Sequence, residues 1–302
     1  MIAELDYPPL NETFERLRTT SDLSSPEWLD LLNLSWNDYQ NFKIAKFELP
    51  EKCLQNLANY FGLTEEQIQI GDIDHRALTM KLEKTPKEMP EIYSKAAFGR
   101  KRTSITSMDF VEKFAGWRLR NDAIKKLGVS ETLLQDPFAS ISMRFITDLC
   151  SYLHRRQFKK LDFFAMGSFT YEGNRNSVVE KLFSELPNAK DAYEFFFNEC
   201  MKLFEQNCIY TITRMGHDNL KVQYITNPYV AAESGIKHLG NAHVCQVKMG
   251  LIANIPRYLG LPASSIKEVS CVHSGDAVCC LEVDFSEANK AQATRPSSKN
   301  WQ

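Results

Sequence analysis

The stretch from Cys245 to Cys280 constrains the fold more than any other part of this chain. It begins as an apolar segment of helical character and ends in K-E-V-S-C-V-H-S-G-D-A-V-C-C. The ending predicts a strand, a tight turn and a second strand, because Ser274-Gly275-Asp276 supplies residue types that reverse a chain at little steric cost. A helix that leads into a hairpin predicts an α+β domain.

Cysteines and one carboxylate are spaced around this turn like a set of metal ligands. Cys271 and Cys279 flank the turn, Glu268 lies three residues before Cys271, and Cys245 lies one helix earlier. Three thiolates and a carboxylate brought together could form a closed tetrahedral zinc site. Buried structural thiols are the alternative, because cysteine is among the most buried residue types even when inert. In an unbroken strand Glu268 and Cys271 point to opposite faces, so shared ligation requires a bulge or a strand end between them.

The E-x2-C-x7-C pattern, with a cysteine on the preceding helix, resembles the zinc-binding end of the 4-vinyl reductase family of sensory domains. That family includes the effector-sensing domains of phenol-responsive activators, and the resemblance covers about Asp191 to Phe285. It implies an α+β sensory domain that dimerises and binds a small apolar ligand. No residues for a phenol hydroxyl can be placed, so the ligand class does not carry over. The resemblance also implies a structural zinc held by Cys245, Glu268, Cys271 and Cys279.

Residues 1–75 read as five short helices joined by tight turns, and Ser25-Pro26-Glu27 is a typical helix start. Their arrangement, closed by L-x2-L-A-x2-F-G-L-T-x2-Q-I, resembles the helix-turn-helix domain of phage repressors. By that resemblance, Trp36–Lys46 would be the recognition helix. Its outward, DNA-contacting residues would be Asn37, Tyr39, Gln40 and Lys43.

The charge of this block argues against DNA. Residues 1–75 hold five Lys and Arg against fourteen Asp and Glu, a net charge of −9, whereas residues 76–160 hold eighteen against nine, or +9. Affinity for DNA comes mostly from basic side chains on phosphates. Docking of a protein by the helical block is therefore the alternative to DNA binding.

The segment 76–106 is polar and charged, which predicts a solvated linker. Its basic run Gly99–Ser104 has a second interpretation, a contact with phosphate or with the acidic first block. Helical periodicity returns after residue 107, and the sensory domain is predicted to span 107–285. The tail 286–302 is polar and is predicted to be disordered.

An aromatic hairpin is the predicted wall of a ligand pocket. C-I-Y-T-I-T-R-M, the turn G-H-D-N and L-K-V-Q-Y-I-T form the two strands, and F-F-A-M-G-S-F-T is a further strand-like run. The alternative is that the aromatic face is simply core. The residues expected to line the pocket are Tyr210, Val222, Tyr224 and Ile266.

Several classes of protein are disfavoured by what the chain lacks. It has no apolar run long enough to span a membrane, and its N-terminus lacks the pattern of a signal peptide. Its eight cysteines then favour reduced thiols in the cytoplasm. No phosphate-binding loop or hydrolase motif is present. Cys271 with His273 is the one candidate nucleophile and base, and no orienting third group is evident.

Together these features predict a cytoplasmic, non-enzymatic regulator. A zinc-stabilised sensory domain would bind a small molecule, and the N-terminal helical domain would act on DNA as a transcription regulator. The alternative is an adaptor whose N-terminal domain docks a protein.

Overall fold

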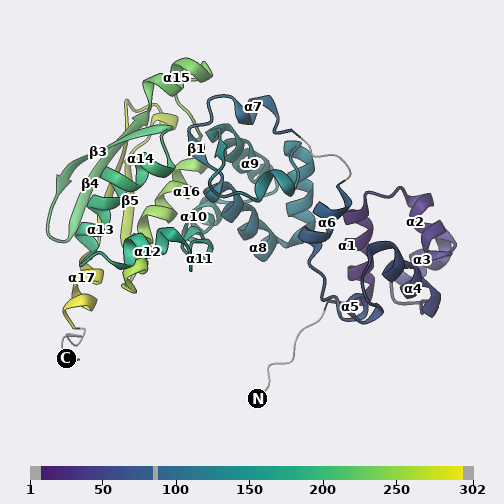
Figure 1. The fold of residues 1–302 in the computed structure, drawn as a ribbon. Coiled ribbons are helices and arrows are strands. Elements are labelled where there is room, and N and C mark those ends of the chain that lie inside the picture. Colours follow the sequence, from purple (N-terminus) through teal and green to yellow (C-terminus); the bar gives the residue numbers. More distant parts are fainter. Residues whose placement is uncertain (1–7, 84–87, 295–302) are drawn as a thin grey trace. The chain divides into compact units, whose positions relative to one another are not determined.

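The computed structural model describes residues 8–83 and 88–294. The chain divides into two compact units between Pro86 and Lys87, and each has its own hydrophobic core (Figure 1). The first unit is helical. The second combines helices with a four-stranded sheet, so the chain is of the α+β class as predicted.

The first unit consists of short helices with well-defined ends. Ser24 and Glu27 form a capping box before the second helix, and the Ser35 hydroxyl accepts from the Asp38 N–H before the third. Phe14 and Trp28 are fully buried in the core of the unit. The helices are α1 (Leu10–Ser21), α2 (Ser25–Leu32), α3 (Trp36–Lys43), α4 (Glu51–Phe61), α5 (Glu65–Ile70) and α6 (His75–Leu82).

The prediction that Tyr39 faces outward from α3 is wrong. Its side chain is 2% exposed, its ring lies 6.5 Å from that of Trp28, and its hydroxyl donates to Glu15 Oε1 at 2.5 Å. Aromatic area this large stabilises a small helical core, which outweighs the pattern of polar neighbours. Asn37 is exposed, whereas Gln40 and Lys43 are half-buried.

The second unit begins with α7 (Glu91–Ser94) and ends with α17 (Ser286–Ala293). Between α13 and α14 the chain forms a π-helical turn, Phe196–Cys200. The other helices are α8 (Arg102–Leu127), α9 (Met143–Arg155), α10 (Lys160–Ser168), α11 (Thr170–Gly173), α12 (Val178–Ser184), α13 (Ala189–Phe195), α14 (Met201–Phe204), α15 (Pro228–Ser234) and α16 (Ala242–Ala253).

Three sequence predictions differ from the structure here. The run predicted as a strand, F-F-A-M-G-S-F-T, forms α10, since a short apolar run does not distinguish a strand from a buried helix. The predicted linker 76–106 contains most of α6, all of α7 and the start of α8, while its residues 84–87 lie outside the described ones. The predicted disordered tail forms α17 over its first eight residues, and 295–302 lie outside the described residues.

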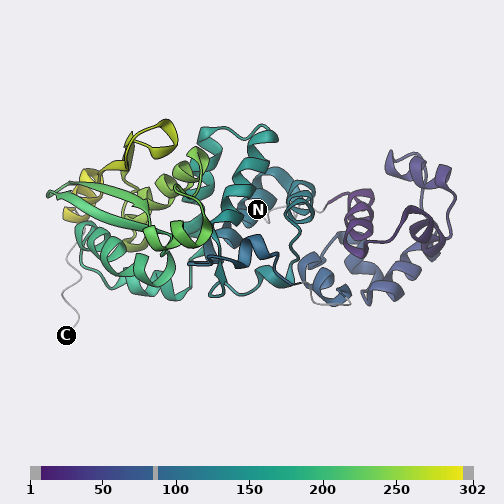
Figure 2. The same cartoon turned by 90° about the horizontal axis from the view of Figure 1, so that it is seen from above.

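The main sheet is antiparallel, with strand order β3-β4-β6-β5. Both predicted hairpins are present: β3 (Cys208–Met215) pairs with β4 (Asn219–Thr226), and β5 (Ser265–Ser270) pairs with β6 (Cys279–Asp284). The register shifts between Glu268 and Ser270, just before the end of β5 at Ser270. Figures 1 and 2 show the sheet at the end of this unit away from α8 and α9.

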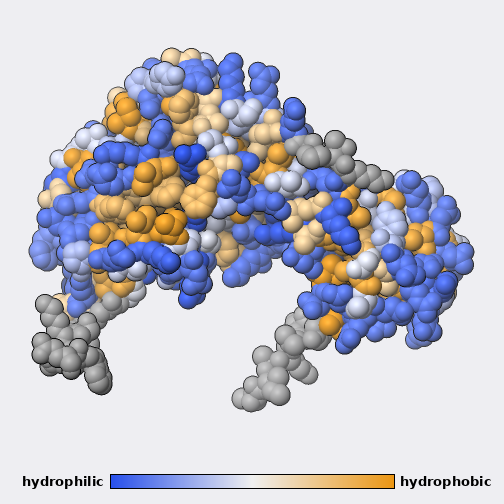
Figure 3. Space-filling model, viewed as in Figure 1, coloured by the Kyte–Doolittle hydropathy of each residue, from blue (hydrophilic) through white to orange (hydrophobic). Residues whose placement is uncertain are grey.

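A second, two-stranded sheet joins β1 (Gly99–Arg100) to β2 (Ser140–Ile141). On the face of the second unit shown in Figure 3, apolar residues gather among hydrophilic ones. Exposed cross-strand partners Ile209 and Ile225, at 45% and 40%, belong to the β3–β4 pair.

Two glycines let α10 and α16 cross at backbone contact. A Cβ added at Gly167 would overlap the Val247 carbonyl oxygen, and one at Gly250 would overlap the carbonyl oxygen of Phe164. Any larger residue must therefore push the two helices apart. This crossing fixes α16, which carries side chains of both the pocket and the thiol cluster described below.

We expect Gly250→Ala to lower the free energy of unfolding by about 3 kcal/mol or more, because the new methyl group meets backbone that cannot move aside. Helix propensity alone predicts the opposite, a gain of about 1 kcal/mol. Urea unfolding measures the difference, and Gly167→Ala tests the reciprocal contact. Stabilisation by either change would contradict the close crossing.

Candidate functional site

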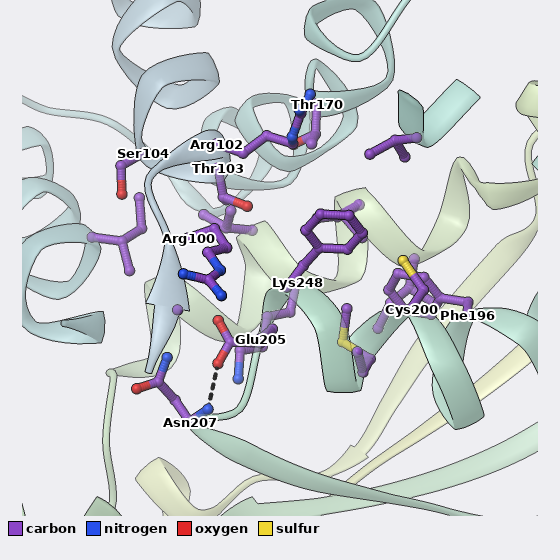
Figure 4. A pocket seen from close by; sticks show the side chains of 18 of the residues that line it. Arg100, Arg102, Thr103, Ser104, Thr170, Phe196, Cys200, Glu205, Asn207 and Lys248 are labelled. Atoms are coloured by element: carbon purple, nitrogen blue, oxygen red, sulfur yellow. Dashed lines mark hydrogen bonds between the residues drawn. The ribbon is translucent and has the colours of Figure 1, made fainter. Parts of the chain in front are cut away.

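A cavity of about 120 Å³ lies within the second unit, beside α16 (Figure 4). Its walls come from the start of α8, from α9, α12 and α14, from the π-helical turn and from α16. Most of the lining side chains are aliphatic or aromatic, including Val179, Phe183 and Leu251. Residues far apart in sequence thus enclose one largely apolar space.

One end of this pocket carries a connected set of polar side chains. Arg102 donates to Asn174 Oδ1 at 2.9 Å, and Asn174 Nδ2 donates to the Tyr258 hydroxyl at 2.9 Å. Thr170 is 3% exposed, and its hydroxyl has no partner in the described structure; the Arg102 Nε is also buried without one. Figure 4 shows the Arg102 side chain extending towards Thr170.

A second polar group lies around Lys248. Its ammonium group donates to Cys208 Sγ at 3.0 Å and lies over the Tyr224 ring, 4.8 Å from the centroid. Burial disfavours its charge, but Cys208, Tyr210 and Glu205 around it raise the pKa of Lys248 well above the ordinary value. Lys248 is therefore a cation within the pocket wall.

Asn207 lies beside this second group and is 1% exposed. Its backbone N–H donates to Glu205 Oε1 at 2.8 Å, the contact drawn in Figure 4. Both polar atoms of its side-chain amide are buried without a partner in the described structure. Natively folded proteins leave few such groups unpaired, so this amide marks a place for a bound molecule or water.

The π-helical turn places two more residues in the wall. Phe196 and Cys200 both line the pocket, and single π-helical turns occur frequently at functional sites. Burial raises the pKa of Cys200 to about 12, so this thiol is neutral at physiological pH.

The thiols expected to hold a metal come together next to the pocket. The sulfur atoms of Cys245, Cys271 and Cys279 all lie within 4.8 Å of one another, with 3.7 Å between Cys245 and Cys271. Besides burial, Glu268 contributes to raising the pKa of the Cys271 thiol, and the Oε1 of Glu268 is buried without a partner among the described residues. We call Cys245, Cys271 and Cys279 the thiol cluster.

The thiols of the cluster differ in their pKa values. A hydrogen bond from Cys245 lowers the pKa of Cys279 to about 6, and the Val272 N–H also donates to its sulfur at 3.4 Å. Burial, first of all, raises the pKa of Cys271 to about 11. Cys279 is the thiolate of the cluster, and Cys271 stays protonated, which argues against Cys271 and His273 as nucleophile and base.

The structure places the residues predicted to line a ligand pocket in different surroundings. Tyr210 lines the main pocket, and Tyr224 lines a smaller space beside the thiol cluster. Val222 is fully buried in the core, and neither Val222 nor Ile266 lines either of these two spaces. The reason is that α16, rather than the open face of the sheet, forms the wall of the pocket.

The polar side chains of the pocket were not predicted from the sequence. Arg102 belongs to the basic run Gly99–Ser104, which was predicted to be a linker or a phosphate contact. The signal in the sequence that could have pointed to Arg102 was its place in a basic run at the start of a helix. Thr170, Asn207 and Lys248 carried no comparable signal, because isolated polar residues do not reveal which of them will be buried.

No protein-family model matches the chain, and no curated protein does. Among solved structures, an H-NOX protein from K. algicida with unliganded Fe(II) is similar, with 9% identity, a TM-score of 0.46, and coverage of 62% of this chain and 97% of that one. An Fe(II) H-NOX protein from S. oneidensis covers 63% of this chain and 97% of its own, at 14% identity and a TM-score of 0.44. An oxygen-binding H-NOX domain related to soluble guanylate cyclases has 10% identity, a TM-score of 0.44, and coverage of 61% and 93%. Likeness at this level assigns neither ligand nor activity.

These findings correct two predictions. The resemblance to the 4-vinyl reductase family and to phage repressors is contradicted, since no family model matches and the similar structures are H-NOX proteins. The predicted structural zinc is contradicted as well, because the similar structures are iron proteins, in Fe(II) or heme form, and not zinc proteins. Zinc is therefore not retained for the thiol cluster.

Heme does not fit the pocket of this chain. None of the described residues that line it is a histidine. Its volume of about 120 Å³ also compares with the roughly 150 Å³ of an engineered cavity that binds benzene, a far smaller molecule than a porphyrin.

None of the described helices is long and apolar enough to cross a membrane.

We expect Cys279→Ser to lower the free energy of unfolding by about 1–2 kcal/mol more than Cys280→Ser. The Cys279 sulfur accepts from Val272 and touches the other thiols, whereas Cys280 points off the opposite face of β6 near Lys221 and Glu282. Urea unfolding under reducing conditions compares the variants. Equal losses would contradict the special role of Cys279.

Proposed function

We propose that this protein is a non-enzymatic regulator whose second unit binds a small, largely apolar molecule in the pocket beside α16. The observation that carries this proposal is the combination of an apolar cavity with buried polar groups that lack protein partners, namely the Asn207 amide, the Thr170 hydroxyl and the Arg102 Nε. Each unsatisfied buried polar group costs about 1–3 kcal/mol. A bound molecule with a polar head would remove that cost.

Water alone would pair with the polar groups at the ends of the pocket, but it would remain in unfavourable contact with the apolar side chains of the wall. A molecule with an apolar body and a polar end matches both parts of the lining. The comparison with the benzene-binding cavity sets its size at one ring or a short chain. Phe196 and Met201, both in the wall, lie where the chain leaves regular α-helix, so the wall can adjust to such a molecule.

The chemistry of the lining favours binding over catalysis. A nucleophilic cysteine or lysine needs a depressed pKa. Cys200 has its pKa raised by burial, and the pKa of Lys248 is raised as well. Both groups are thus in the protonation state that binds rather than attacks.

Replacement of Leu251 by Trp should fill the pocket and abolish ligand binding. A screen of single-ring and short-chain compounds by thermal shift, in full-length protein, should find compounds that raise the melting temperature. A ligand at a hundred times its Kd stabilises by about 2.7 kcal/mol, which is easily measured. Leu161→Trp is the matched control, because Leu161 is 79% exposed. No stabilising compound, or equal stabilisation of the Leu251→Trp protein, would sink the proposal.

The first unit is the candidate output module, and its surface favours docking of a protein. Trp36 and Ile44 are 57% and 60% exposed at the two ends of the α3 region. Exposed aromatic and aliphatic side chains of this kind serve protein contacts. The burial of Tyr39 removes one predicted DNA contact, and residues 1–75 carry a net charge of −9. DNA is therefore the weaker alternative. A homodimer through the second unit stays a prediction.

We expect full-length protein to bind no DNA duplex even at low salt, where phosphate contacts are strongest. Fluorescence anisotropy with random-sequence duplex across a salt series measures this. Binding that weakens with salt and is lost in Gln40→Ala would restore the transcription-regulator alternative.

A further inference from the structure

We propose that the ligand of the pocket is a monocarboxylate whose head is held by the first turn of α8 together with Arg102. This inference rests on the proposed function of the same pocket, and it names the chemical class of the ligand.

The first turn of α8 opens into the pocket. Arg102, Thr103 and Ser104 line the cavity and are the first three residues of α8, whose first helical segment runs to a kink at Gly116. The first helical hydrogen bond is donated by the Ile105 N–H to the Lys101 carbonyl at 2.8 Å, and no described residue accepts from the three preceding amides. The Lys101 side chain provides no cap. Such free amides, at the positive end of a helix dipole, favour an anion.

Arg102 is a half-buried cation without an acidic partner among the described residues. Its contacts are the Asn174 amide oxygen at 2.9 Å and the Phe138 ring at 4.9 Å, both neutral. By contrast Arg120, which is buried, forms ion pairs with Glu112 and Glu131. A buried charge without a counterion is costly, so Arg102 is the residue that an anion would stabilise.

Thr170 gives evidence for a bound anion that depends neither on the helix amides nor on Arg102. Its hydroxyl is buried, lines the cavity and has no partner, and Asn174, four residues later, bonds Arg102. A carboxylate oxygen could accept from this hydroxyl while its other oxygen accepts from the guanidinium or the helix amides.

The charge of the lining sets the charge of the head group. Three cations, Arg100, Arg102 and Lys248, and one carboxylate, Glu205, line the pocket, which leaves +2. Glu205 lies beside Lys248 (Figure 4), and Arg100 is exposed to solvent and donates to the Phe138 carbonyl and the Ser140 hydroxyl, so Arg102 is the half-buried cation of the lining without an acidic partner among the described residues. A single negative charge matches it, whereas a dianion such as phosphate would bring a second charge into an apolar cavity at high desolvation cost.

The apolar part of the ligand would lie against Val179, Phe183 and Leu251. A cavity comparable with one that holds benzene has room for a short chain. Hexanoate is therefore a suitable probe, and its neutral counterpart 1-hexanol has the same length without the charge.

Calorimetric titration of full-length protein with both probes tests the inference. Hexanoate should bind about tenfold to a hundredfold more tightly than 1-hexanol, the range expected for one charge-assisted hydrogen-bonding site. Arg102→Gln should remove that preference, because hexanoate then binds no more tightly than 1-hexanol. An unchanged melting temperature shows that the variant is folded. Arg100→Gln is the matched control at the other end, and it should keep the preference for hexanoate.

The outcomes separate this inference from the proposed function. Equal binding of both probes by the unaltered protein would overturn the carboxylate assignment and leave small-molecule binding in place. Loss of the preference in Arg100→Gln but not in Arg102→Gln would overturn the placement of the head group. Binding of neither probe, with no hit among other small molecules, would overturn both.

Discussion

The second unit depends on the contact between the backbones of α10 and α16. Gly167 and Gly250 face the opposite helix with no side chain between them, so the helices cross closer than any Cβ allows. This fixes α16 between the helical part and the sheet. One side of α16 then presents Val247, Lys248 and Leu251 to the pocket, and Cys245 reaches the strand that carries Cys279. The pocket and the thiol cluster are thus two consequences of one helix position.

The same cavity is lined by polar groups that have no protein partner among the described residues. Arg102, Thr170 and Asn207 each leave buried atoms without partners around one cavity. At about 1–3 kcal/mol each, these groups cost a large share of the net stability of an ordinary domain. Groups whose local rules are left unsatisfied are expected at functional sites, which is where these three residues line one cavity.

Local patterns in the sequence predicted the elements whose causes are local. Turn residues and alternation predicted both hairpins, and Ser25-Pro26-Glu27 predicted the start of α2. Predictions failed where tertiary packing decides. The apolar run of α10 predicts a strand because its helical crossing partner lies far away in the sequence, and the polar neighbours of Tyr39 predict an exposed side chain because its core partners come from other helices. The pocket escaped prediction for the same reason: its wall is assembled from many separate elements.

The most direct test of a ligand-binding pocket beside α16 is a crystal structure of the full chain with an ω-bromohexanoate. The account predicts an anomalous bromine peak among Val179, Phe183 and Leu251, with the carboxylate at Arg102 and the first turn of α8. Bromine bound only outside the second unit, with the cavity closed by its own side chains or filled by ordered water, would contradict it.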